Sequence, residues 1–152
     1  MKKVIISLLF VVGFSFISFG QSHDVKWQED YDKAVKKAKK QNKPILLFFT
    51  GSDWCGPCKM LVSDFFESKK FSKIADESLI VYEVDFPRNK DLITQKQRKK
   101  NYYLSRMYDV NSYPTIVIID KNGNEIARKK SYNLMRDPSY HFNFLKKALK
   151  NI

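Results

Sequence analysis

The sequence is poor in the residues that build disulfide scaffolds, collagen or flexible linkers. Its 152 residues include two cysteines, five glycines and five prolines. Two cysteines cannot form several bridges, and this glycine and proline content excludes collagen-like and low-complexity chains. With 43% hydrophobic and 29% charged residues, the chain has the apolar side chains of a folding, soluble protein. At this length we expect a single domain with its own core.

Charged side chains are missing from residues 4–19. Lys2 and Lys3 precede this run, and small residues, Ser18 and Gly20, lie near its end at the positions that signal peptidase reads. The pattern predicts a signal peptide over residues 1–20 and an exported mature domain over residues 21–152, in the periplasm or cell envelope. An uncleaved membrane anchor is the alternative, but sixteen residues at about 1.5 Å each are short for a layer of roughly 30 Å.

Acidic residues and histidine are scarce as well. The chain has 16 Asp and Glu against 28 Lys and Arg, which gives a formal charge of +12. Residues 96–100, followed by Tyr102 and Tyr103, have the composition of a nucleic-acid patch, but in an exported domain we interpret them as a solvated helix face above buried tyrosines. We therefore expect no nucleic-acid partner. His23 and His141 lie far from the cysteines in sequence, so we expect surface histidines and no metal site.

Apolar spacing predicts alternating strands and helices. Short apolar runs predict buried strands over residues 45–50, 79–85 and 115–120, and Asn122-Gly123 predicts a tight turn into a returning strand over 125–130. Helical spacing predicts helices over 27–41, from 56 onward, over 71–76, through most of 86–109, and after 137. This order is typical of an α/β domain with a right-handed parallel unit and a closing hairpin.

The last two helical segments are assigned inward faces from their apolar residues. In the segment 86–109 the expected inward residues are Leu92, Ile93, Tyr103, Leu104 and Met107. In the last helix they are Tyr140, Phe144, Leu145, Ala148 and Leu149. Neither segment carries residues in a pattern that suggests chemistry.

The two cysteines lie where the first buried strand gives way to a helix. At a helix N-terminus the free backbone N–H groups and the helix dipole stabilise a thiolate, so we expect Cys55 to be an exposed nucleophile with a pKa below about 8.5. Cys58 lies one turn further and is within bonding distance, so it can resolve a mixed disulfide formed on Cys55. Pro57 stiffens the turn, Gly56 lets a substrate backbone approach, and Trp54 offers a flat apolar surface.

The run Trp54-Cys55-Gly56-Pro57-Cys58-Lys59-Met60 resembles the active site of thioredoxin, and Tyr113-Pro114-Thr115 resembles the cis-proline loop of that family. The resemblance covers about residues 25–150 and is closest to exported proteins related to the envelope thiol:disulfide interchange group. It implies a thioredoxin fold, with a central mixed sheet flanked by helices and an N-terminal helix. It also implies a redox-active disulfide, Cys55–Cys58, with no other cofactor. The substrate-binding residues that it implies are Trp54, Gly56, Pro57, Tyr113 and Pro114.

The sequence departs from thioredoxins at two places. Thioredoxins carry a buried carboxylate in the strand before the motif, where this chain has Phe48 and Phe49, so the proton of Cys58 must go to another group. Asp53 is a candidate that acts through water, although a capping or solvated acid is the simpler interpretation. Tyr113 replaces a small aliphatic residue before the proline, which narrows the substrate groove or adds a hydroxyl.

The predicted function is dithiol–disulfide exchange with protein substrates, as a monomeric reductant in the cell envelope. A reductant there needs a membrane electron donor of the interchange type to restore the dithiol. Three alternatives remain open at this point: an oxidase or isomerase, a copper(I) carrier that uses the two thiolates, and a chaperone-like docking module.

Overall fold

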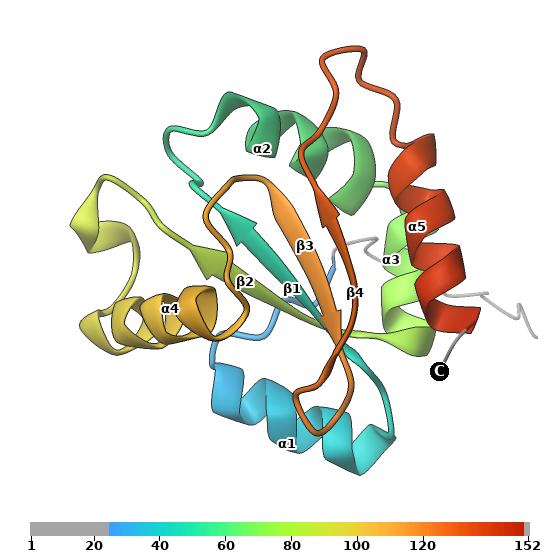
Figure 1. The fold of residues 1–152 in the computed structure, drawn as a ribbon, viewed down its shortest axis with the longest axis horizontal. Coiled ribbons are helices and arrows are strands. Elements are labelled where there is room, and N and C mark those ends of the chain that lie inside the picture. Colours follow the sequence, from blue (N-terminus) through green and yellow to red (C-terminus); the bar gives the residue numbers. More distant parts are fainter. Residues whose placement is uncertain (1–24, 151–152) are drawn as a thin grey trace, which may run out of the picture.

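A computed structural model describes residues 25–150 (Figure 1), so the predicted signal peptide and His23 lie outside the described residues. The strands are β1 (Ile45–Thr50), β2 (Ile80–Asp85), β3 (Thr115–Ile119) and β4 (Glu125–Lys130). The helices are α1 (Tyr31–Gln41), α2 (Gly56–Leu61), α3 (Lys69–Ser78), α4 (Gln95–Met107) and α5 (Ser139–Lys150). A π-helical turn, η1 (Val62–Phe66), continues α2, and a 3-10 turn, η2 (Lys90–Leu92), precedes α4. No helix among residues 25–150 is long and apolar enough to cross a membrane.

The four strands form one mixed sheet in the order β2-β1-β3-β4. β1 and β2 run parallel, whereas β3 pairs antiparallel with both β1 and β4. The turn between β3 and β4 contains Gly123 at φ 93°, a conformation that glycine adopts without strain. The parallel unit and the closing hairpin predicted from the sequence are therefore confirmed.

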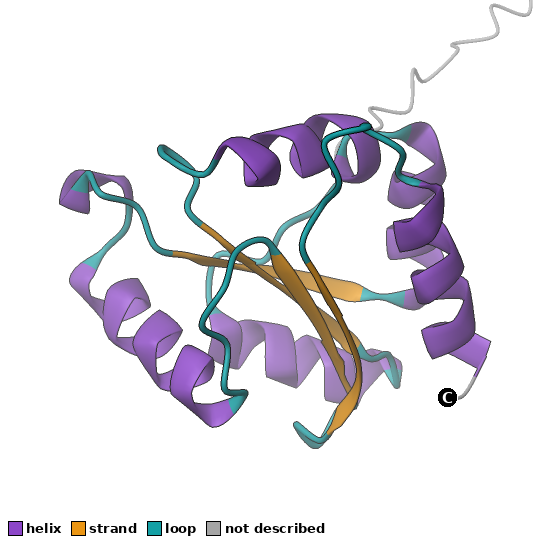
Figure 2. Cartoon of the chain, turned by 45° about the horizontal axis from the view of Figure 1, so that its top comes forward, coloured by secondary structure: helices purple, strands orange, loops and turns teal. Residues whose placement is uncertain are grey.

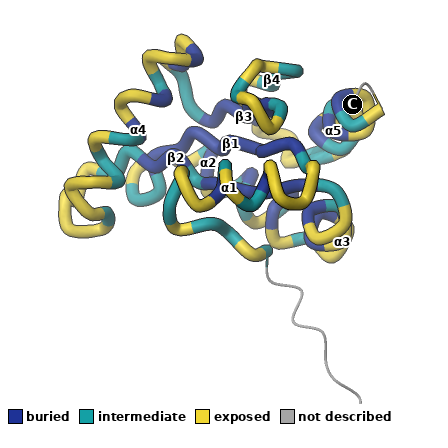
Figure 3. The backbone as a smooth tube through the Cα atoms, turned by 90° about the horizontal axis from the view of Figure 1, so that it is seen from below, coloured by how far each residue is buried: buried dark blue, intermediate teal, exposed yellow. Residues whose placement is uncertain are grey.

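Helices cover both faces of the sheet, as Figure 2 shows. Side chains alternate along β1, so Leu46 and Phe48 join one buried cluster with residues of α2, η1, α3 and α5. Ile45, Leu47 and Phe49 join a second cluster with α1 and α4. The buried strands in the middle and the exposed outer helix faces are visible in Figure 3. Because β1 is covered on both sides, its six residues are all buried, as its continuous apolar run predicts.

The first helix starts later than predicted, at Tyr31 rather than Trp27. The Asp30 side chain accepts a hydrogen bond from the Lys33 backbone N–H and caps the helix. The residues before it run alongside β2 instead, where Gln28 forms an isolated parallel bridge with Tyr82. The apolar spacing of Trp27 therefore reflects packing of an extended segment and not a helical turn.

Several residues predicted to face inward, and one predicted to be a buried tyrosine (Tyr102), are more than half exposed. These are Leu92, Tyr102, Tyr103, Met107 and Tyr140, so the predictions for them are wrong. The buried face of α4 is set by Asn101 and Leu104, and that of α5 by His141, Leu145 and Ala148. Both sets follow the three- and four-residue spacing of one helix face, and each contains a polar residue that apolarity alone does not find. The expectation that His141 lies at the surface is therefore wrong.

Candidate active site

The Cys55–Cys58 pair lies at the carboxyl end of β1, where α2 begins. Cys55 is the N-cap of α2, and the two cysteines form a disulfide with their Cα atoms 5.2 Å apart. The Cys58 backbone N–H donates to Cys55 Sγ at 3.3 Å. A backbone donor aimed at this sulfur favours a thiolate once the disulfide is reduced. The local geometry matches the predicted position of the nucleophile at the start of a helix.

The two sulfurs are less accessible than predicted. Cys55 is 4% exposed and Cys58 is 1% exposed in this disulfide-bonded state, so the expectation of an openly exposed sulfur is wrong. Cys55 belongs to the buried cluster on its face of the sheet, and Tyr113 packs against that cluster. Disulfide exchange needs access to only one sulfur along the axis of the S–S bond. The order in which the two sulfurs react and the lowered pKa of Cys55 stay predictions.

The loop before β3 lies beside the cysteines. The Tyr113–Pro114 peptide bond is cis, which confirms the predicted cis-proline loop. Thr115 pairs with Phe49 near the carboxyl end of β1, and that register brings Pro114 to the edge where the cysteine motif follows β1. The Pro114 carbonyl accepts a hydrogen bond from the Ser131 backbone N–H at 2.8 Å, which fixes the loop to the end of β4.

An aromatic surface made of Trp54, Tyr113, Phe86 and Tyr102 extends from the cysteines towards α4. Successive rings lie 5.9, 5.4 and 5.3 Å apart, and the Trp54 side chain is 39% exposed. The Arg88 guanidinium lies over the Trp54 ring, 5.2 Å from its centre. This surface therefore places apolar rings next to the disulfide, with a positive charge at its edge.

Asp53 holds the loop that follows β2. Its two carboxylate oxygens accept the backbone N–H groups of Arg88 and Asn89 at 3.0 and 2.8 Å, and these bonds lower the pKa of Asp53. The Trp54 indole N–H donates to the Phe86 carbonyl in the same loop at 2.8 Å. The carboxylate therefore holds the loop after β2, a contact that neither sequence interpretation predicted.

Hydrogen bonds also connect the end of β2 to the loop before the cysteines, and the sequence did not predict them. The Asp85 carboxylate, at the end of β2, accepts hydrogen bonds from the Ser52 backbone N–H at 2.8 Å and from the Ser52 hydroxyl. The Asp85 backbone carbonyl accepts from the buried Asn101 side chain of α4. An acid directly after an apolar strand is the signal that could have indicated such a contact.

A cavity of about 350 Å³ lies behind Cys58 and is lined by Thr50, Lys59, Glu67 and Glu83, among others. Glu83 is the one charged residue within β2 before its last position, and it is half-buried. Burial raises the pKa of Glu83 to about 7, and the nearby Asp85 carboxylate adds to this effect. Sequence reasoning placed no function on this residue, although a lone acid inside an apolar strand is a signal that can be read.

The comparisons with known proteins agree with this site. A family model for a thioredoxin-like domain matches residues 31–137. The chain belongs to the thioredoxin-like family. It is similar to disulfide bond reductase DsbH of Chlamydia pneumoniae, with 40% identity over 105 residues, and to thioredoxin-related protein DsbJ of the same organism, with 27% identity over 133 residues.

The coverage of these relatives is partial. The alignments cover 69% and 86% of this chain, but only 62% and 38% of the two relatives. A solved structure titled DsbH Oxidoreductase matches with a TM-score of 0.74 and 35% identity, covering 84% of this chain and 85% of that one. The thioredoxin fold, with a mixed sheet, flanking helices and the N-terminal helix α1, is thereby confirmed.

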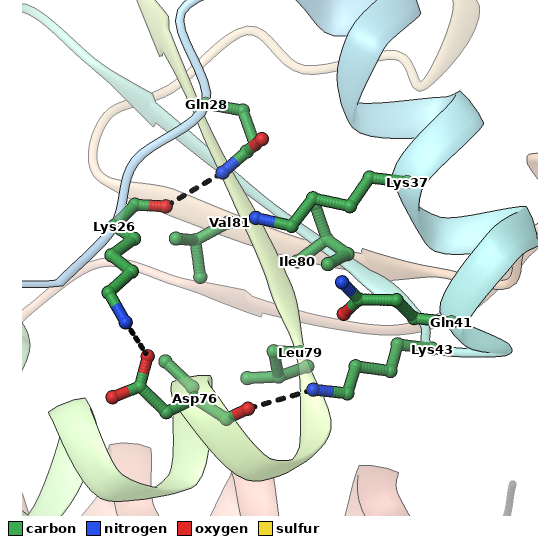
Figure 4. A pocket seen from close by; sticks show the side chains of 10 residues that line it. Lys26, Gln28, Lys37, Gln41, Lys43, Asp76, Leu79, Ile80 and Val81 are labelled. Carbon is green, nitrogen blue, oxygen red and sulfur yellow. Dashed lines mark hydrogen bonds and ion pairs between the residues drawn. The ribbon is translucent and has the colours of Figure 1, made fainter.

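Another cavity of this thioredoxin-like domain lies at the opposite end of the sheet (Figure 4). It is lined by residues that precede or begin β1 and β2, including Lys43 and Ile80, whereas Cys55 follows the other end of β1. Asp76 contacts two lysines of this cavity. The Lys26 ammonium lies 3.5 Å from the Asp76 carboxylate, and the Lys43 ammonium donates to the Asp76 backbone carbonyl at 2.8 Å. This cavity is therefore separate from the redox site.

Proposed function

We propose that this protein is a thiol-disulfide oxidoreductase that reduces disulfides of protein substrates. The observation that carries the proposal is the Cys55–Cys58 disulfide at a helix start, next to a cis-proline loop and an aromatic surface. The similarity to a relative named a disulfide bond reductase supports the direction. Among residues 25–150 no three His, Cys, Asp or Glu side chains group as metal ligands.

The reaction moves two electrons from the dithiol to the substrate. The Cys55 thiolate attacks one sulfur of a substrate disulfide; that S–S bond breaks, and the other substrate sulfur leaves as a thiolate. The Cys58 thiol then loses its proton and attacks Cys55 Sγ, which breaks the mixed disulfide and forms Cys55–Cys58. Trp54, Gly56, Pro57, Tyr113 and Pro114 hold the substrate chain beside the two sulfurs. The released substrate ends with two thiols.

The cellular setting belongs to the same proposal. Residues 1–20 act as a cleaved signal peptide, and the mature chain works as a monomer in the periplasm or cell envelope, where a membrane electron donor of the interchange type reduces Cys55–Cys58 again. Disulfide substrates persist outside the cytosol, which supports this location. The mass of the mature protein isolated from cells tests whether the chain is cleaved after Gly20.

Insulin reduction in the presence of dithiothreitol tests the activity. The wild-type protein is expected to accelerate the reaction, and Cys55→Ser is expected to lose this acceleration. Equal rates for the two proteins would refute the enzyme proposal and favour a docking module. Equilibration with glutathione tests the direction, because a potential close to those of strong oxidants, about −120 mV, would instead indicate an oxidase.

A further inference from the structure

Glu83 and Cys58 face the same side of the sheet. Side chains alternate along β2, and Val81 belongs to the cluster that contains Phe48 and Cys58. Glu83 lies two residues further along the strand and pairs in register with Phe48, so it shares that face. β1 itself carries no titratable side chain, so the acid nearest to Cys58 from within the sheet comes from the neighbouring strand.

The cavity behind Cys58 connects the two residues. Its volume of about 350 Å³ is far above the 10–15 Å³ that one water molecule needs, and its lining includes hydroxyl, ammonium and carboxylate groups. The outer residues Lys59 and Glu67 are exposed, so the cavity reaches bulk solvent. It therefore places the buried Cys58 side chain and the half-buried Glu83 carboxylate on one space that is large enough for water and open to solvent.

The Glu83 carboxylate has no other role among the described residues. It takes part in no hydrogen bond or ion pair within residues 25–150, in contrast to Asp53 and Asp85. The charged groups that face it are Asp85 on the same strand, Lys59 and Glu67 across the cavity, and Glu29 on the adjoining segment. A half-buried acid without a partner costs stability, which suggests a function for keeping it.

We propose that Glu83 accepts the proton of the Cys58 thiol through the water of this cavity and thereby controls the rate at which the mixed disulfide is resolved. This inference rests on the proposed function. The thiol and the carboxylate become a thiolate and a carboxylic acid; the Cys58 thiolate attacks Cys55 Sγ, the bond from Cys55 to the substrate breaks, and the substrate thiolate leaves. Glu83 then returns its proton to solvent, so no further reactant is needed.

The protonation behaviour of Glu83 suits this role. A base works best when its pKa is near the working pH, and burial holds the pKa of this carboxyl at about 7. A neutral amide at residue 83 removes this base and therefore changes the pH at which resolution becomes fast.

Rapid-quench kinetics with a synthetic peptide that contains one disulfide tests the proposal. The full-length reduced protein is mixed with the peptide from about pH 5.5 to about pH 9, and the acid-trapped mixed disulfide is quantified by mass spectrometry. Glu83→Gln is expected to slow resolution at least about tenfold at neutral pH, within the range of general-base effects, while attack by Cys55 keeps its rate. The mixed disulfide then accumulates, and its resolution accelerates only near the thiol pKa of about 8.5.

Two further variants serve as controls. Glu67→Gln removes a carboxylate from the exposed rim of the same cavity and is expected to match wild type, whereas Glu83→Asp is expected to restore much of the rate and of the pH profile. Wild-type resolution rates and pH dependence in Glu83→Gln would overturn the inference, as would equal losses in Glu67→Gln. If Glu83→Gln does not fold, the wild-type protein still tests the inference. A plot of its resolution rate against pH that shows no step near the Glu83 pKa would overturn the inference. Absence of any mixed disulfide in the wild type would instead refute the proposed function.

Discussion

The buried His141 and the half-buried Glu83 are expected to make stability depend on pH in opposite directions. His141 is 2% exposed, and neither ring nitrogen has a hydrogen-bond partner of normal geometry. Burial, followed by the charge of Lys129, lowers the pKa of His141 to about 4, and a weaker backbone contact with Ser131 acts against this. Burial raises the pKa of Glu83 to about 7.

The signs follow from proton binding in the folded and unfolded states. Folded His141 binds fewer protons than the unfolded chain, so its contribution is complete above pH 6.5 and is lost as the pH falls through about 4. Folded Glu83 binds more protons, so its contribution is complete below pH 4.5 and is lost as the pH rises through about 7. Since a tenfold change in a protonation constant equals about 1.4 kcal/mol, each contribution is at most about 3 kcal/mol, and that of Glu83 is smaller because it keeps some contact with solvent.

Urea unfolding of the oxidised full-length protein, followed by circular dichroism between about pH 4.5 and about pH 7.5, measures both effects. The wild type is expected to change by less than about 1 kcal/mol because the two contributions oppose each other. From the lower to the higher pH, His141→Phe is expected to lose about 2 kcal/mol and Glu83→Gln to gain about 2.5 kcal/mol. Carboxylates with lowered pKa, such as Asp30 at about 2, titrate mostly below this window. Parallel pH profiles for all three proteins would refute the reasoning.

Three other substitutions test the surroundings of the cysteines. Gly51→Ala places a Cβ inside the Trp54 indole and is expected to change tryptophan fluorescence and lower insulin reduction. Gly56→Ala meets no atom within 4 Å and is the matched control for the fluorescence alone, because Gly56 belongs to the proposed substrate-binding residues. Asp53→Ala is expected to accelerate amide hydrogen exchange in the loop after β2, because two N–H groups lose their acceptor; unchanged exchange would contradict this. Asn101→Leu leaves two buried partners unpaired and is expected to cost about 2–4 kcal/mol in urea unfolding, and a loss below about 1 kcal/mol would argue against it.

Much of the sheet could be predicted because its strands carry local signals. β1 agrees with its apolar run at both ends, and the hairpin follows from Asn122-Gly123. The start of α1 was misplaced because Trp27 fits a helical spacing, while its actual contacts are with the rings of Phe48 and Phe66 in the core. Apolar spacing shows that a residue is buried, and it does not distinguish a helix face from an extended segment that packs on the same core.

The site divides in the same way between local and non-local information. The cysteines, Trp54 and the cis-proline loop lie in contiguous motifs, so they can be recognised from the sequence alone. Their burial cannot, because it depends on how separate elements pack together. Glu83 shows this limit, because its relation to Cys58 depends on the register of β1 with β2 and on which face α2 covers. Phe48 and Phe49 stand where thioredoxins carry a buried carboxylate. Their presence implies that another group accepts the Cys58 proton, but it does not indicate where that group lies. The pairing of β1 with β2 indicates that place, because Glu83 lies next to Phe48 on the neighbouring strand. A carboxylate moved to that strand stays on the same face of the sheet as the reacting sulfur.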